Sequence, residues 1–307
     1  MTEHRVSLQY GAVSATQYLR VRAAEVNTFL DGLWEASNIA APAMRLYDAM
    51  RYSLCGTGKR IRPVLCMATA ESFGVPVERA LTAAAAIECI HTYSLIHDDL
   101  PSMDNDDLRR GRPTNHKVYG DAIALLAGDG LLTFAFELLS QKMDVLPHRQ
   151  VRMVAVLAQA AGASGMVGGQ AADILATGQG GNEELLQYIH INKTARLIQA
   201  SIVIGGLFAD LTPTEDDALA AFGLALGLVF QMVDDVLDIV GDEQALGKSV
   251  GSDVGQNKLT YPSLIGVEAT LALAEKTLLE GLAQLEKLSV PVPLLYEIAQ
   301  FVLHRDR

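Results

Sequence analysis

Two clusters of aspartates, each at the end of an apolar run, are the residues best suited to chemistry in this chain. One cluster occupies residues 98–104 (DDLPSMD), and the other occupies residues 234–238 (DDVLD). On a helix, Asp234 and Asp238 share one face because they are four residues apart, and Asp235 flanks that face. Carboxylates this close repel one another unless a cation joins them, so the spacing predicts a metal site.

The clusters favour Mg²⁺ or Mn²⁺ over zinc, because carboxylates are hard oxygen ligands. Mg²⁺ usually takes one or two carboxylates and completes its shell with water and substrate phosphates, which predicts a phosphorylated substrate. The alternative is a pair of solvated acidic helix ends, but the segments before both clusters are almost wholly apolar and should be buried. Pro101 stops a regular helix, so we expect Asp104 to reach the site from a kinked or looped segment.

Basic residues that could hold phosphate lie close to these clusters in the sequence. Residues 58–63 (GKRIRP) and 109–113 (RRGRP) each contain three cations. Isolated cations in neutral surroundings are Lys193, Lys248 and Lys258. In a chain of net charge −12, such groups favour polyphosphate recognition, in which Arg binds two oxygens and Lys acts as a point charge. Surface solubility is the alternative, and it is plausible for Arg60 and Arg112 alone.

Three further polar residues are candidates for the same site. His91 lies seven residues before Asp98, two helical turns along the same face, although a core histidine is the usual alternative. Gln170 and Asp173 are three residues apart and share a helix face. They could line the cavity or brace Lys193, and a buried polar pair is an equally good interpretation.

The elements that position these residues are predicted to be helices. Ala and Leu abound, β-branched runs are short, and residues 183–204 carry apolar side chains at three- and four-residue steps. No linker divides the chain. We therefore expect an all-α fold in which residues 1–307 form a single large helical bundle, with the two aspartate-bearing halves facing each other across a cavity.

Composition excludes several other classes of protein. Half of the 307 residues are hydrophobic and 20% are charged, which is too apolar for a disordered chain. Acidic residues outnumber basic ones by 36 to 24, so no broad basic field is available and we expect no nucleic-acid partner. Cys55, Cys66 and Cys89 form no CxxC pair, which disfavours a disulfide framework and favours a reducing compartment.

The sequence also predicts no membrane partner and a cytoplasmic location. The N-terminal residues contain no apolar core of signal-peptide length. The most apolar stretch, residues 218–233, falls short of the roughly 20 residues that a spanning helix needs. We expect it to be a buried core helix.

Together, the motifs resemble the trans-isoprenyl diphosphate synthases, most closely the bacterial farnesyl diphosphate synthase group. The matching segments run in order from about Met44 to the tail: GKRIRP, HTYSLIHDDLPSMDNDDLRRGRPT, LLAGDGLL, GGQAADI, NKT, FQMVDDVLD, LGK, SDVGQNKLTYP and FVLHRDR. One aspartate motif would be weak evidence for this family, whereas two aspartate motifs joined in order by the cation motifs are specific for it. Asn105 departs from the group, which often has Asp there. The resemblance implies helices around a deep central active-site cavity and a homodimer.

The resemblance also assigns a role to each matched residue. The Mg²⁺ ions that clasp an allylic diphosphate would be bound by Asp98, Asp104 and Asp234. The metal shells would be completed or braced by Asp99, Asp235 and Asp238. The same diphosphate would be held by Arg109, Lys193, Lys248 and Lys258. Isopentenyl diphosphate would be held by Lys59, Arg62, His91 and Arg110. The reacting carbons would be lined by Thr194 and Gln231, whose oxygens would stabilise positive charge.

The implied reaction is the condensation of isopentenyl diphosphate with an allylic diphosphate. It would use Mg²⁺, about three ions per site with substrate bound, and Mn²⁺ could substitute. Metal and cations stabilise the leaving diphosphate, and apolar walls keep water from the carbocation. The double bond of isopentenyl diphosphate then attacks, and the departed diphosphate removes the proton.

Product length should depend on what blocks the cavity beneath the first aspartate cluster. Tyr93 and Ser94 lie five and four residues before Asp98, about 6–8 Å along the helix. Tyr93 is bulky enough to form a floor, and Ser94 is not. Together with the inserted residues 101–102, this resembles the subgroup that makes the C15 product, farnesyl diphosphate. If Tyr93 instead packs into the bundle and the floor lies deeper, the product is the C20 compound, geranylgeranyl diphosphate.

Two more distant functions are less consistent with the motifs. A class I terpene cyclase shares the ionisation chemistry, but it typically alters the second aspartate motif and needs no isopentenyl site such as Lys59 and Arg62. A non-catalytic subunit of a prenyl synthase should have lost ligand residues, and this chain retains them.

Overall fold

The computed structural model describes residues 14–34, 39–240 and 258–305. Its long helices are α1 (Ala15–Gly32), α2 (Met44–Leu54), α3 (Ile61–Ser72), α4 (Val77–Asp98), α6 (Asp121–Ser140), α7 (Pro147–Ala161), α8 (Met166–Ala176), α10 (Arg196–Gly206), α11 (Pro213–Val240), α15 (Val267–Leu285) and α16 (Pro293–His304). Shorter helices are η1 (Ala41–Ala43), α5 (Asn115–Tyr119), α9 (Glu183–Ile189), η2 (His190–Ala195) and α14 (Tyr261–Ile265). The predicted all-α fold is confirmed.

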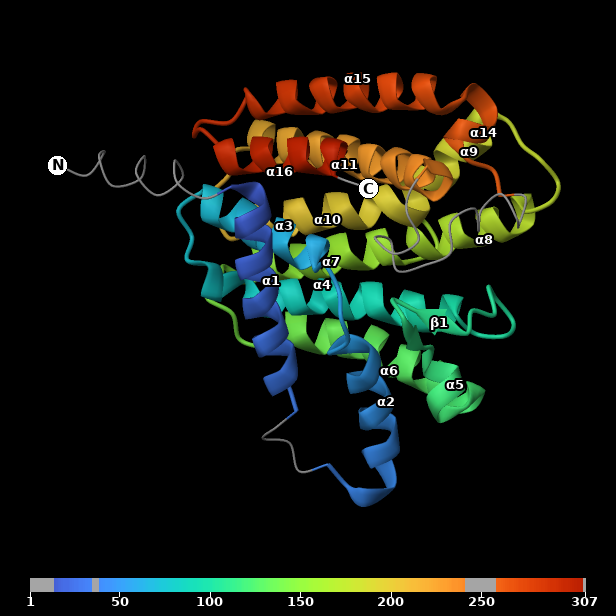
Figure 1. Cartoon of the computed structure of the whole chain (residues 1–307). Coiled ribbons are helices and arrows are strands. Elements are labelled where there is room, and N and C mark those ends of the chain that lie inside the picture. The colour runs from blue at the N-terminus through green and yellow to red at the C-terminus, as the bar shows by residue number, and fades with distance from the viewer. Residues whose placement is uncertain (1–13, 35–38, 241–257, 306–307) are drawn as a thin grey trace.

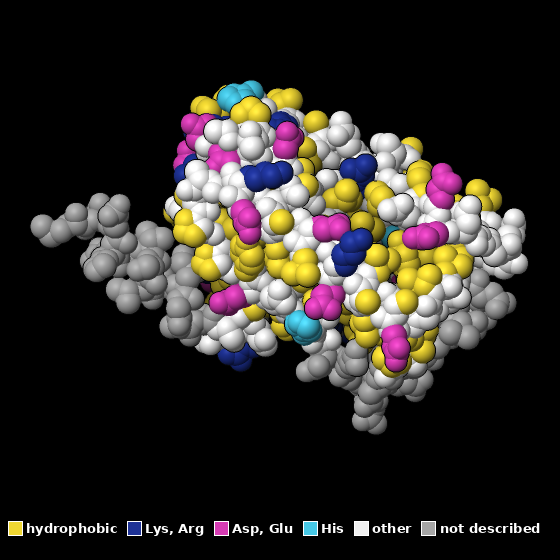
Figure 2. Space-filling view, turned by 90° about the horizontal axis from the view of Figure 1, so that it is seen from above, with side chains coloured by type: hydrophobic (Ala, Val, Ile, Leu, Met, Phe, Trp, Pro, Cys, Tyr) yellow, Lys and Arg dark blue, Asp and Glu magenta, His cyan; other side chains and the backbone are white. Residues whose placement is uncertain are grey.

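The helices pack in a layered order that brings the two aspartate-bearing helices into one bundle. In Figure 1, α15, α11, α10, α4 and α6 run in similar directions one beneath another, while α1 and α2 cross them at a steep angle. Direct packing links α15 to α11, α11 to α10, α10 to α3, α3 to α4, and α4 to α6. On the face over α15, acidic and basic side chains are interspersed with apolar ones (Figure 2).

Two apolar clusters form the core, and α3 and α10 contribute to both. One cluster gathers α2, α4, α6 and α7, and the other gathers α11, α15 and α16. On α3, Cys66 and Met67 face the first cluster, whereas Val64 and Leu65 face the second. A helix that lies between two layers must be apolar on both sides, which is why α3 and α10 show little polar surface.

The starts and ends of the aspartate-bearing helices follow from local sequence. α4 ends at Asp98, shortly before Pro101. α11 begins at Pro213 behind a capping box, in which the Glu215 N–H donates to the Thr212 hydroxyl and the Thr212 N–H donates to the Glu215 carboxylate. It then runs for 28 residues to Val240. The helix is therefore longer than its most apolar stretch, residues 218–233.

Three helical segments of the described chain are long and apolar enough to cross a membrane by length and composition alone: 121–140, 147–176 and 213–240. The stretch 218–233 is a buried core helix, as expected, but the helix that contains it is longer than expected because the flanking polar turns are also helical. In the bundle, 56% of the apolar window of α11 is buried against other helices.

One small hairpin interrupts the helical fold. Strands β1 (Leu108–Arg109) and β2 (Arg112–Pro113) pair antiparallel, with Arg109 opposite Arg112. The two residues between them, Arg110 and Gly111, both have positive φ angles, of 54° and 75°. This is the backbone that tight two-residue hairpins require, and it presents the RRGR motif at the end of the first aspartate segment.

Candidate active site

The first aspartate cluster lies where α4 ends. Beyond Asp98 the chain turns back, so that the Asp104 N–H donates to the Asp98 carbonyl at 2.8 Å. The prediction that Asp104 comes from a looped segment is therefore confirmed. Burial and the nearby Asp104 carboxylate raise the pKa of Asp98 to about 6, against the opposing charges of Lys193 and Arg109.

Asp99 has a different environment from its neighbour. It is buried, and its Oδ1 accepts hydrogen bonds from Arg109 Nε at 2.9 Å and from Arg109 Nη2. Burial raises the pKa of Asp99, while Arg109 lowers it. Arg109 also contacts Asp106 at 3.1 Å. Asp99 thus fixes Arg109 beside the cluster.

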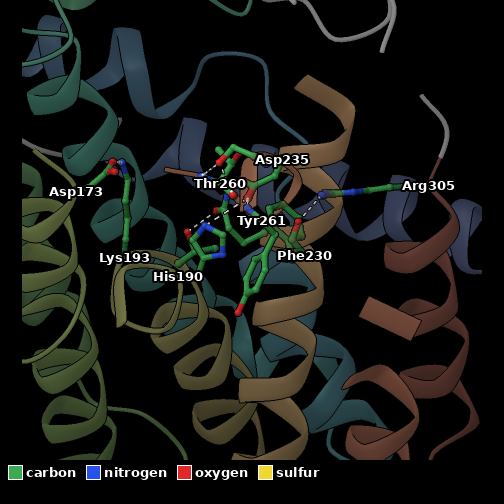
Figure 3. Close-up of polar contacts among 11 residues, drawn as sticks. Asp173, His190, Lys193, Phe230, Asp235, Thr260, Tyr261 and Arg305 are labelled. Carbon is green, nitrogen blue, oxygen red and sulfur yellow. Dashed lines mark hydrogen bonds and ion pairs between the residues drawn. The ribbon is translucent and has the colours of Figure 1, made fainter. Parts of the chain in front are cut away.

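A π-helix, η2, carries Lys193 and Thr194. Such widened turns are rare, and they are frequently found at functional sites. Lys193 Nζ lies 2.5 Å from Asp173 Oδ2 on α8 (Figure 3). Gly169 allows this close approach, because a Cβ there would lie 2.2 Å from the Lys193 backbone nitrogen. The interpretation that Asp173 braces Lys193 is confirmed, and the Gln170 Oε1 atom is buried without a hydrogen-bond partner among the described residues.

η2 connects the two aspartate clusters. Lys193 lies close enough to Asp98 to lower the pKa of that carboxyl. The next residue, Thr194, donates its hydroxyl to Gln231 Oε1 at 2.7 Å, and Gln231 lies one turn before Asp235 on α11. Both clusters therefore border the same region of the bundle.

The second cluster lies on the last turns of α11, with Asp235 and Asp238 buried and Asp234 half-buried. Residue spacing alone did not indicate the partner of Asp234, which is Arg305. Arg305 Nη2 donates to Asp234 Oδ1 and to the Phe230 carbonyl, both at 2.8 Å, and its guanidinium lies 3.9 Å from the centre of the Phe230 ring (Figure 3). In the sequence, only the place of Arg305 in the tail motif FVLHRDR connected it with this site.

A group of basic residues lies beside the clusters. Burial lowers the pKa of Arg62. The carboxylates of Glu88 and Asp234 oppose this shift, and Arg110 and Arg305 add to it. Burial, followed by Arg62 and Arg110, holds the pKa of His91 well below its usual value. The Arg62 Nε atom is buried and has no hydrogen-bond partner among the residues that the structure describes. Mutually repelling cations with an unsatisfied donor are suited to binding an anion.

The remaining predicted cations differ in their placement. Lys59 is exposed. Arg110 Nη1 donates to the Thr57 carbonyl at 2.6 Å. Lys258 is half-buried and begins the segment that leads into α14. Lys248 lies outside the described residues.

The interpretation of Arg60 as a surface cation was wrong. Arg60 is only 3% exposed, and its Nη1 lies 2.6 Å from Glu88 Oε1 on α4. Its Nε donates to Asn27 Oδ1 at 2.8 Å. Arg60 thus anchors the GKRIRP segment to the core. Arg112 is exposed as expected, and it stacks on Tyr52.

The candidate chain-length residues sit one turn below Asp98. Tyr93 is 5% exposed within the larger apolar cluster, with its ring edge-on to His97 at 5.7 Å. Burial and Asp98 raise the pKa of Tyr93 to about 12. Ser94 is half-buried and donates to the His91 carbonyl at 2.9 Å.

The chemistry of the donors fits Mg²⁺. Within the described residues, no three His, Cys, Asp or Glu side chains are already close enough to hold an ion together. Mg²⁺ needs only one or two carboxylates and takes its other ligands from water and phosphate. Asp98 and Asp104 supply a half-buried pair whose mutual repulsion such an ion would relieve.

The family model described as polyprenyl synthetase matches residues 43–290. The chain belongs to the polyprenyl synthetase family. As a member of this family, it is 46% identical to a chloroplastic geranylgeranyl pyrophosphate synthase of Capsicum annuum, over 94% of this chain and 78% of the relative. It is 48% identical to a farnesyl diphosphate synthase of Geobacillus stearothermophilus, over 83% of this chain and 86% of the relative.

Solved structures agree with this assignment. An FPP/GFPP synthase of Zymomonas mobilis is similar over 94% of this polyprenyl synthetase chain and 99% of its own, with 37% identity and a TM-score of 0.81. A geranyltransferase of Helicobacter pylori complexed with magnesium and isoprenyl diphosphate is similar over 94% and 96%, with 34% identity and a TM-score of 0.80. The resemblance to trans-isoprenyl diphosphate synthases is confirmed.

Proposed function

We propose that this prenyltransferase condenses isopentenyl diphosphate with dimethylallyl or geranyl diphosphate in a Mg²⁺-dependent reaction that makes farnesyl diphosphate. The observation that carries the proposal is the link between the two aspartate clusters through η2. Lys193 lies close enough to Asp98 to lower the pKa of its carboxyl, and Thr194 contacts Gln231 beside the second cluster. An allylic diphosphate between the clusters would meet carboxylates on both sides and a lysine between them.

The residues divide into two groups around the reacting carbons. Arg109 and Lys193 would hold the allylic diphosphate, and Arg62, His91 and Arg110 would hold isopentenyl diphosphate. When bound at Asp98, Asp104 and Asp234, Mg²⁺ would supply positive charge for the departing diphosphate. The oxygens of Thr194 and Gln231 would stabilise positive charge on the allylic carbons after that bond breaks.

A product assay tests this function. Purified protein receives Mg²⁺ and labelled isopentenyl diphosphate with C5, C10 or C15 allylic diphosphates in turn, and the dephosphorylated products are sized. We expect C15 product from the C5 and C10 substrates and no extension of C15. Extension of the C15 substrate to C20 would support the proposed condensation reaction but refute farnesyl diphosphate as its final product. No condensation with any substrate would refute the function.

The geranylgeranyl product is the second candidate, because the Capsicum relative, which is named for that product, is similar over 94% of the chain. The farnesyl product is supported by the similarity to the Geobacillus enzyme. Tyr93 remains the candidate floor one turn below Asp98, and its packing against His97 does not by itself distinguish the two products. We further propose that the chain is a single domain and acts as a cytoplasmic homodimer.

Replacing Tyr93 with Ala is expected to shift the main product from C15 to C20, because it would open space about one turn below Asp98. The measurement is the ratio of C20 to C15 product with a geranyl substrate. The matched control is Tyr188→Ala on α9, which is 46% exposed and should leave the ratio unchanged. Unchanged C15 output from Tyr93→Ala would show that the floor lies elsewhere.

A further inference from the structure

Asp235 and Asp234 are adjacent in sequence but occupy opposite environments. The Asp235 side chain is 2% exposed and the Asp234 side chain is 42% exposed. Asp234 meets Arg305 at the edge of the site, whereas Asp235 points into the packing between α11, η2 and α14 (Figure 3). Because their burial and their contacts both differ, the two aspartates are suited to different tasks.

Both carboxylate oxygens of Asp235 accept hydrogen bonds from protein groups. Oδ1 accepts from Gln231 Nε2 at 2.8 Å, and Oδ2 accepts from the Tyr261 backbone N–H at 3.2 Å. His190 Nε2 lies 3.4 Å from Oδ2. A side-chain amide and a backbone N–H therefore both contribute to stabilising the charge of Asp235.

The Asp235 carboxylate determines which way the Gln231 amide points. An ionised carboxylate can only accept hydrogen bonds, so the Gln231 NH₂ group must face it. The Gln231 carbonyl oxygen is then directed to Thr194, whose hydroxyl donates to it at 2.7 Å. An Asn in place of Asp235 would present its NH₂ group, a donor, to either the Gln231 amide or the Tyr261 N–H, and Gln231 would be expected to rotate its amide.

The second contact ties a distant segment to α11. The Tyr261 N–H that binds Asp235 lies at the start of α14, next to Thr260, whose side chain caps that helix. Lys258 stands three residues before Tyr261. One carboxylate therefore holds both the Gln231 amide and the backbone that follows Lys258.

We propose that Asp235 is a positioning residue rather than a metal ligand: it fixes the Gln231 carbonyl oxygen toward Thr194 and fixes the start of α14 against α11. This inference rests on the proposed function for its catalytic consequence. Residues that orient the groups around a metal site typically contribute about 10- to 100-fold to metal affinity or to activity, and a residue that acts through Gln231 and α14 should affect activity.

A cycle of three variants tests it: Asp235→Asn, Gln231→Glu, and the two combined. The first should lower kcat about 10- to 100-fold with little change in the Mg²⁺ concentration for half-maximal rate. Gln231→Glu places two carboxylates in contact and should also be impaired.

The double variant exchanges the amide and the carboxylate between the two positions. The new amide at position 235 can donate to the new carboxylate at position 231 and still accept from the Tyr261 N–H. The carboxylate at position 231 still accepts from the Thr194 hydroxyl. We therefore expect the double variant to be more active than either single one.

Thermal unfolding without metal or substrate gives a second readout of the same cycle. Each single variant should unfold at a lower temperature than the wild type, and the double variant should recover most of that loss. Asp217→Asn, an exposed change on the same helix, is the matched control and should alter neither readout. If the wild type shows no condensation, the proposed function fails, and recovery in the unfolding cycle still tests the hydrogen-bond arrangement.

The opposite pattern would overturn the proposal. If Asp235 were a metal ligand, Asp235→Asn would raise the Mg²⁺ concentration for half-maximal rate severalfold. Adding Gln231→Glu would then recover no activity. Failure of the double variant to recover thermal stability would show that the hydrogen-bond directions at Gln231 do not depend on Asp235.

Discussion

Asp98→Asn is expected to lower kcat about 10²- to 10³-fold, because it removes a charge that the metal-assisted departure of diphosphate requires. The same change should raise the thermal stability of the metal-free protein at pH 7. Burial raises the pKa of Asp98 to about 6, so the ionised carboxylate is less favourable in the folded chain than in the unfolded one. Steady-state kinetics and thermal unfolding in the presence of a chelator measure the two effects.

The opposite signs of these effects distinguish a functional charge from a structural one. Asp144→Asn is the matched control, since that side chain is 84% exposed, and it should change neither quantity appreciably. An Asp98→Asn variant with near-normal kcat would exclude Asp98 as a ligand. A variant that loses stability as well as activity would show that the carboxylate supports the fold.

Arg60→Met is expected to destabilise the protein by about 3–5 kcal/mol, because it leaves the Glu88 carboxylate buried without its partner. The pair is nearly inaccessible, with side-chain exposures of 1% and 3%. Urea unfolding followed by circular dichroism measures the loss. Because the anchored segment also carries Lys59 and Arg62, we expect the surviving enzyme to have a raised KM for isopentenyl diphosphate.

Two further variants separate the buried charge from the loss of packing. Arg112→Met, in the neighbouring cation motif, should lower the free energy of unfolding by no more than about 1 kcal/mol, because that guanidinium is exposed and stacks on Tyr52. The double replacement Arg60→Met with Glu88→Leu should recover much of the stability, since no charge remains buried. A double variant as unstable as Arg60→Met would contradict this account.

The features that could be predicted from sequence are those fixed by local spacing. Asp234 and Asp238 share a helix face at any position in the fold, Pro101 ends a helix wherever it stands, and a row of apolar residues predicts a buried helix. Spacing likewise places Gln170 and Asp173 on one face of α8, although it left open whether Asp173 braces Lys193 or only forms a buried polar pair.

The features that could not be predicted depend on contacts between distant segments. Arg60 and Arg62 look alike in sequence, yet one is neutralised by Glu88 on α4 and the other has no such partner in direct contact among the described residues. Arg305 meets Asp234 across 71 residues of chain. The difference in burial between Asp234 and its neighbour likewise depends on where α14 packs, and spacing alone carries no information about that.

The π-helical turn at residues 190–195 makes chain length, as well as residue identity, a requirement for this site. An α-helix rotates by about 100° per residue, so deleting one residue here and restoring a regular helix would turn everything on one side of it by that angle. Lys193 and Thr194 could then no longer lie near Asp98 and contact Gln231 at the same time. We expect single-residue insertions and deletions to be tolerated in the surface connections of this bundle and to be excluded from this turn, even where each substitution within it is mild.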